Sequence, residues 1–481
     1  MLKTIIRKEL LENIFSFRFP LFAVLCLVLI PLGMYVNQAH LEKKIRDYQE
    51  QDRLAADAFT KITMADVMAG KVAVRAFRPP VRLSVFAQGF ESVLPQYYEF
   101  TQDGFTPGEA ASGDESLASA QGKIDFVFLV QMVLSLIALL FASDVIAGEK
   151  EAGTLRAILA NNLPRDSVLF GKIWGGFLAL WGPFTVAFLL GLIVLLAVGF
   201  PVFGGNSPVR ILTLFFAASF FLLVYFVIGC MISSSFGKSR TALVVILLVW
   251  VSFQLIVPKL GDMIADLVRP IRTETEVSLA KSLLAKSLDD EMARELGRQY
   301  TLLFPNGESI PKKGAPPTPE QTKWSALEPE IEKNARSNKA RQLGRIDETY
   351  RQEKRTRNSL ASNLSVLSPS AAFGRLLADI CGTGEIERTK YMEAVQAYQG
   401  TLEKAVFSKV TKRVMILPGG GTRMNFATDR EALKAQPKFS ISSATPGEAF
   451  SSNLSSLASL LFWLIASFAA AYIRFRTYDV R

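Results

Sequence analysis

The residues most able to do chemistry lie in three glycine-containing segments that resemble parts of a phosphate-binding loop. Such a loop needs the pattern GxxxxGK followed by Ser or Thr between a strand and a helix, so that backbone amides and the lysine surround phosphate. Gly237-Lys238-Ser239 has only the last three positions, with Ile232 in place of the first glycine. Residues 148–153 have the glycine spacing but continue with Thr-Leu, and residues 419–421 indicate a turn. We therefore expect a non-catalytic chain that binds no cofactor itself.

The sequence contains no pattern typical of a metal site, a disulfide framework or a nucleic-acid-binding surface. The single histidine, His40, cannot form a His-based metal site or a catalytic triad alone, and Cys26, Cys230 and Cys381 show neither a disulfide framework nor a CxxC pair. The formal net charge is +10, but the basic residues are interleaved with acids rather than gathered with aromatic residues. We expect no metal site and no nucleic-acid partner.

Long apolar runs dominate the chain, of which 50% is hydrophobic. Each run is long enough to cross a hydrocarbon core, which takes about 20 residues, and continuous runs predict helices rather than the alternating strands of a barrel. The six runs are 19–36, 124–143, 173–200, 211–232, 241–258 and 454–473. The first run is not a cleaved signal peptide, because it contains two prolines and no small-residue cleavage pattern follows it. The sequence thus predicts a mainly α membrane protein with six transmembrane helices.

Ion-coupled transport is not supported by these runs. Proton and ion carriers place ionisable residues inside the membrane. Asp125 and Asp144 lie only at the edges of the second run, whereas the interiors hold neutral polar residues such as Gln131, Gln254 and Tyr225. We therefore do not expect a proton or ion relay.

Lysine and arginine in the short flanking segments predict the orientation. They lie before the first run, throughout 144–172, in 233–240 and in 474–481, whereas the short connection between the third and fourth runs has only Arg210. We therefore expect both termini and these segments to be cytoplasmic. Residues 1–18 predict a helix on the lipid surface, although Glu9 interrupts its apolar face.

The two long insertions, 37–123 and 259–453, are expected outside the cytoplasm as a helix-rich domain with short strands. A charged helix should continue the first run outward, and the fifth run should end at Pro258. Alternating residues predict extended structure at 71–77 and 82–90, and a short strand at 437–443. The charges of 325–364 are typical of a solvated helix.

The segment Gly148–Lys172 stands out between the second and third runs. It predicts a short helix with Glu149 and Glu151 near its start, ending before Pro164, and then a second helix that enters the third run. Gly153 would let a partner approach the backbone, and apolar residues after it would form a contact face. The alternative is a solvated loop that merely follows the charge rule.

At these residues the chain resembles the permease subunits of bacterial ABC exporters of the type-two class. The family has an acidic pair, Gly-Thr-Leu, apolar positions, Pro-Arg and Gly-Lys in its coupling-helix region. The matching residues are Glu149, Glu151, Gly153, Thr154, Leu155, Ile158, Pro164, Arg165, Gly171 and Lys172. Residues 78–95 and 367–384 are similar to a subgroup with large extracytoplasmic insertions, although Gly384 stands where that subgroup often has Asp.

This resemblance implies an exporter permease in the bacterial cytoplasmic (inner) membrane, paired with a second copy of itself or a similar permease. A separate cytoplasmic ABC ATPase dimer would hold ATP and Mg²⁺. Glu149, Glu151 and Arg165 would provide polar docking, and Leu155 a buried contact with the ATPase. Ser235, Lys238 and Arg240 would form a second cytoplasmic contact. Force transmission to a periplasmic partner without transport, and a membrane-anchored scaffold, remain alternatives.

Overall fold

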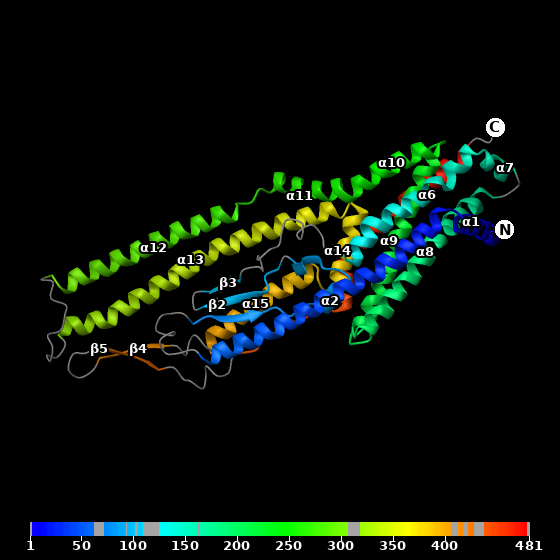
Figure 1. Cartoon of the computed structure of the whole chain (residues 1–481). Helices are drawn as coiled ribbons and strands as arrows, with labels where there is room; N and C mark the ends of the chain where they lie inside the picture. Colours follow the sequence, from blue (N-terminus) through cyan, green and yellow to red (C-terminus); the bar gives the residue numbers. More distant parts are fainter. Residues whose placement is uncertain are drawn as a thin grey trace.

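The computed structural model is elongated, with a helical bundle at one end and a domain of long helices at the other (Figure 1). It describes residues 2–61, 72–92, 94–101, 104–108, 125–160, 164–305, 318–405, 411–416, 422–427 and 437–478. The glycine triplet at 419–421 lies outside the described residues. Both termini lie at the same end of the bundle (Figure 1), which we call the terminal end.

Six helices among the described residues are long and apolar enough to cross a membrane, which confirms the predicted fold class. Each apolar run falls on one of them. In chain order they are α2 (Arg18–Thr60), α5–η3–α6 (Phe126–Phe128, Leu129–Leu134, Ser135–Glu151), α8 (Arg165–Ala197), α9 (Ser207–Ser235), α10–η4–α11 (Ser239–Val251, Ser252–Ile256, Val257–Val268) and α18 (Leu454–Arg476). The segments η3 and η4 are π-helical turns within otherwise α-helical spans.

Two of these helices extend beyond a membrane's thickness. Helix α2 has 43 residues, or roughly 65 Å at 1.5 Å per residue, about twice a hydrocarbon core of about 30 Å. The fifth helix also continues past Pro258, where the apolar run ends, to Val268. Pro258 is tolerated because it lies in the first turn of α11, directly after the π-helical turn, where its missing N–H disturbs the ladder least.

The described parts of 72–108 and 269–452 form what we call the insertion domain. Its longest elements, α12 (Glu274–Leu303) and α13 (Pro319–Ser365), lie side by side as a helical hairpin (Figure 1). Ion pairs cross the hairpin: Lys281–Asp347 at 2.8 Å, Lys339–Asp289 at 2.7 Å and Lys354–Glu274 at 2.9 Å. The predicted charged helix is therefore partly solvated and partly paired to its neighbour.

A small antiparallel sheet forms the core of the insertion domain. It contains β1 (Val74–Phe77), β2 (Tyr97–Thr101) and β3 (Gly104–Pro107). Phe100 of this sheet packs against Tyr398 of α15 (Glu385–Ala405) with ring centroids 5.1 Å apart. The remaining elements are the 3₁₀ turns η1 (Arg82–Val85) and η2 (Gly89–Ser92), α14 (Pro369–Cys381), the hairpin β4 (Thr411–Ile416) and β5 (Thr422–Ala427), and α17 (Pro446–Ser452).

Two strand predictions are wrong. Residues 82–85 form η1, because Leu83, Ser84 and Val85 are all buried, whereas a strand on a sheet would bury alternate residues. Within 437–443, all of which the structure describes, there is no strand.

The second and fourth spans pack closely against each other at Gly229. A Cβ added at Gly229 of α9 would lie 2.5 Å from the Cβ of Ala142 and 3.3 Å from the carbonyl oxygen of Leu139 in α6. Small residues allow such close backbone approach in membrane helices. This contact therefore requires glycine.

We predict that Gly229→Ala lowers the free energy of unfolding by about 1–3 kcal/mol, the range for overpacking. Gly182→Ala in α8 is the control, because a Cβ there would meet nothing within 4 Å. Thermal unfolding of the detergent-purified protein measures both. Equal loss of stability in the two variants would contradict the close contact.

Candidate functional site

The segment 148–172, which contains α7 (Thr154–Ala160), lies at the terminal end together with α1 (Leu2–Ile14) (Figure 1). Glu149 and Glu151 lie in the last turn of α6, and not at the start of a separate helix as expected. Gly153 then turns the chain with φ of +75°, a conformation that favours glycine. Pro164 caps the start of α8. The connector is therefore one short helix held between two spans.

The central feature is a buried lysine between two carboxylates. Lys172 Nζ lies 2.8 Å from Glu9 Oε1 and 2.6 Å from Glu149 Oε1. The Lys172 side chain is 1% exposed, and those of Glu9 and Glu149 are 7% and 16% exposed. These residues come from α8, α1 and α6, so one charge cluster, which we call the Lys172 cluster, joins three helices.

Helix α1 reaches this cluster because two glycines of α8 let it approach. A Cβ added at Gly171 would lie 2.4 Å from Cγ2 of Ile5, and one added at Gly175 would lie 2.6 Å from Cβ of Glu9. Burial raises the pKa of the Glu9 carboxyl, and the neighbouring Lys172 ammonium opposes that rise. In the Gly-Lys pair of the motif, Gly171 thus lets α1 pack closely on α8, and Lys172 forms an ion pair with Glu9 of α1.

Several residues predicted to meet a partner make contacts within the chain. Leu155 is 0% exposed and belongs to the core of the bundle, with Ile158 packed at its edge. Arg165 donates hydrogen bonds to the backbone carbonyls of Arg476 and Tyr478, the latter at 3.1 Å. The sequence missed Glu9 and these two carbonyls as partners. The only signal was the interruption of an apolar helix face by Glu9.

The two predicted contact segments lie next to each other. Glu151 Oε2 accepts a hydrogen bond of 2.9 Å from the backbone N–H of Ser239, at the start of α10. Both segments carry exposed side chains at this place, and we call this set of side chains the docking face. They are Glu151, Thr154, Arg156, Ser235, Lys238 and Arg240.

The structure is thus that of a multi-span helical membrane protein in which a short helix with an exposed polar face is fastened to the spans at the terminal end. The model of the ABC-2 family transporter proteins matches residues 3–480, and the chain belongs to this family. It is a membrane permease subunit of an ABC transporter, which confirms the resemblance noted in its sequence. A comparison with curated proteins finds no match.

We predict that Lys172→Met destabilises the protein by about 3–5 kcal/mol, because it removes the buried ammonium between Glu9 and Glu149 and leaves them with the half-exposed Lys8, 4.0 Å from each. Lys8→Met is the control, since the Lys8 side chain is 50% exposed and its ion pairs contribute at most about 1 kcal/mol. The triple change Lys172→Met, Glu9→Gln, Glu149→Gln should recover most of the loss. Chemical unfolding in detergent provides the measurement, and no recovery in the triple variant would argue against charge as the cause.

The stability of Lys172→Met should also depend on pH. A carboxyl whose pKa is raised by folding favours the folded state increasingly as the pH falls through the folded pKa. Without Lys172 the ammonium no longer opposes the rise at Glu9. We therefore expect the difference in unfolding temperature between wild type and Lys172→Met to narrow between about pH 7.5 and about pH 5, above the ordinary glutamate pKa of about 4.3. A gap independent of pH would contradict this.

Proposed function

We propose that this permease couples ATP hydrolysis by a separate ABC ATPase dimer to movement of its spans, and that it works as an exporter. In this proposal it forms one half of a pair with a second copy or a similar permease in the bacterial inner membrane. The terminal end, with both chain termini, is cytoplasmic. ATP and Mg²⁺ bind to the ATPase, and this chain contributes no cofactor site and no catalytic residue.

The observation that carries the proposal is the fixed position of α7 beneath an exposed polar face. Leu155 anchors α7 in the bundle core, and the Lys172 cluster holds the adjoining ends of α6 and α8. A partner that moves the docking face must therefore move both spans. Shifting a two-state equilibrium from 1:99 to 99:1 takes about 5.5 kcal/mol of differential binding, which only a stiff connection transmits.

The contacts within the chain guide our choice of the residues that would touch the ATPase. Glu149 and Leu155 are occupied inside the chain, and Arg165 holds the C-terminal end of α18. We assign docking to the exposed side chains of Glu151 and Arg156, with the neighbouring face at Lys238 and Arg240. Export of a hydrophobic or amphipathic substrate agrees with spans whose interiors lack the ionisable residues of an ion relay.

Arg156→Glu tests the docking face. We expect ATP-dependent activity of the purified permease–ATPase complex to fall about tenfold, the effect of losing an interface arginine that contributes about 1–2 kcal/mol. Arg294→Glu is the matched control, because Arg294 is also an exposed helical arginine but lies on α12 in the insertion domain. Unchanged complex assembly together with unchanged ATPase activity in Arg156→Glu would show that α7 is not the docking element.

A second candidate function is transmission of force to a periplasmic partner without transport. It is favoured by contacts that join the spans to the insertion domain. Asp125 accepts from the backbone N–H of Phe128 at 2.7 Å, at the start of the second span, and from the backbone N–H of Gln88 in the insertion domain at 2.9 Å. Within the insertion domain, the neighbouring Ala87 carbonyl accepts from Thr383 Oγ1 at 2.9 Å. Movement of that span would therefore reach the insertion domain directly.

Reconstitution of the complete complex in vesicles separates the two functions. If it exports, ATP should drive accumulation of fluorescent amphipathic probes on the side opposite the ATPase, and Arg156→Glu should reduce this accumulation. If it transmits force only, ATP should change distances between spin labels in α2 and α12 while no probe moves. Failure of any nucleotide-binding subunit to co-purify would instead favour the scaffold alternative.

A further inference from the structure

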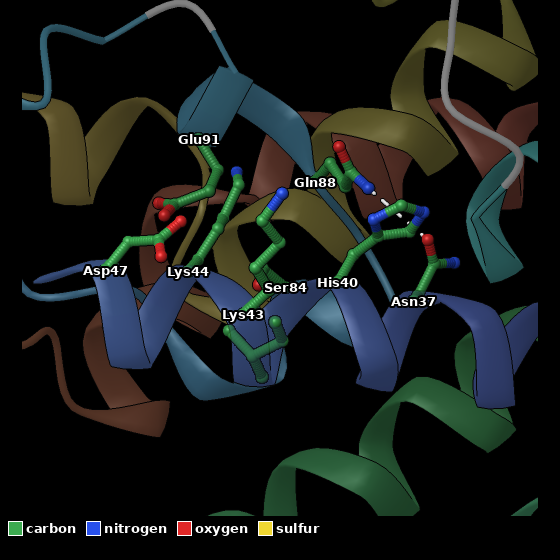
Figure 2. Close-up of a pocket in the computed structure, with 9 residues that line it drawn as sticks. Asn37, His40, Lys43, Lys44, Asp47, Ser84, Gln88 and Glu91 are labelled. Atoms are coloured by element: carbon green, nitrogen blue, oxygen red, sulfur yellow. Dashed lines mark hydrogen bonds between the residues drawn. The ribbon is translucent and has the colours of Figure 1, made fainter. Parts of the chain in front are cut away.

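A pocket of about 190 Å³ lies beside α2, where this helix meets the segment that carries η1 and η2 (Figure 2). Its polar lining includes His40, Lys43 and Lys44 from α2 and Ser84 and Gln88 from the facing segment. None of these residues belongs to the docking face. On α2 the pocket lining runs from Asn37 to Asp47, in the middle of this 43-residue helix.

The sequence of α2 places this pocket at the edge of the lipid-facing surface. Exposed apolar side chains follow α2 from Leu21 to Tyr35 and Val36, and the pocket lining begins at Asn37. Residues 37–47 lie roughly 28–44 Å along the helix from Arg18, that is, from about the edge of a hydrocarbon core of about 30 Å outward into the headgroup region. A tyrosine at the boundary is typical of the membrane interface. The pocket therefore opens at the level of lipid headgroups.

Hydrogen-bond donors without partners face this pocket. Ser84 is 7% exposed, and its hydroxyl has no hydrogen-bond partner among the described residues. Lys43 likewise has no acidic partner in the described part of the chain. Gln88 donates its side-chain amide to Asn37 at 3.4 Å, beside the His40 ring (Figure 2). An ammonium and a buried hydroxyl together suit an anion with several acceptor oxygens.

The acidic residues that line the pocket do not prevent it from binding an anion. Glu91 forms a buried ion pair with Arg78. Asp47 lies at the far end of the pocket from His40 and Gln88, beside Lys44 (Figure 2). The donors of Lys43 and Ser84 remain for a ligand.

We propose that this pocket binds the phosphate of a phospholipid headgroup in the outer layer of the membrane. A phosphodiester carries one negative charge, which matches one unpaired ammonium, and its oxygens accept from Lys43 and Ser84. The acyl chains would lie along the exposed apolar face of α2 that ends at Val36. This continuity with the lipid-facing surface favours a lipid over free phosphate as the source of the anion. The site is independent of the ATPase partner.

Native mass spectrometry of the full-length, delipidated protein in detergent tests the site. The added probes are dioleoylphosphatidylglycerol, dioleoylglycerol as a lipid without phosphate, and inorganic phosphate. We expect tight binding of the phospholipid alone, weakened about tenfold by Lys43→Gln and about threefold by Ser84→Ala, as for a charged and a neutral hydrogen bond. Arg46→Gln is the matched control, because the Arg46 side chain is 68% exposed on the same helix and does not line the pocket.

Ser84→Ala should keep the wild-type unfolding temperature, because its hydroxyl bonds to no described residue, so a loss of binding there cannot be attributed to misfolding. Equal phospholipid affinity in wild type, Lys43→Gln and Ser84→Ala would overturn the proposal. Equal binding of dioleoylglycerol would also overturn it, because phosphate would then play no part. Binding of inorganic phosphate with no preference for the phospholipid would assign the site to a soluble anion and overturn the lipid assignment.

Discussion

The buried ammonium of Lys172 determines how the terminal end is built. Taking three charges out of water costs several kcal/mol per ion, and the mutual attraction repays this only when the geometry is close. Glu9, Glu149 and Lys172 must therefore keep their positions on three separate helices. This is why α8 carries glycine at 171 and 175, where α1 passes over it. Helix α1 is consequently a fixed part of the bundle as well as a surface helix.

A second buried cation organises the opposite end of the spans. Arg210 at the start of α9 is 9% exposed and donates to the backbone carbonyls of Ile380, at 3.1 Å, and Ala444. Ile380 lies in the last turn of α14, where unpaired carbonyls and the helix dipole favour a positive charge. The one basic residue in the short connection between the third and fourth apolar runs thus has local partners. The spans and the insertion domain share this contact.

The sequence predicted what composition alone determines. Lipid imposes long apolar runs, and six runs correspond to six helices. Contacts between residues far apart in the sequence could not be predicted from composition. Glu9 was visible as an irregularity in an apolar helix face, but its partner Lys172 lies 163 positions away, and only folding brings them together. Leu155 was predicted to make a buried contact with a partner, and the structure buries it in this chain's own core. An apolar side chain in a motif cannot by itself reveal whether it faces the chain's own core or another protein.

Continuous helix connects the terminal end to two π-helical turns in the spans. Helix α6 runs from the Lys172 cluster to η3, a π-helical turn, and η4 is a second such turn in the fifth span. Wider turns leave carbonyls that need other donors. Gln254 Nε2 donates to the carbonyl of Gln131 at 2.6 Å, and the hydroxyls of Ser368 and Ser370 donate to the carbonyl of Phe253 at 2.6 and 2.8 Å. Because those serines begin α14, the two widened turns contact the insertion domain directly, and α6 joins the turn of the second span to the Lys172 cluster.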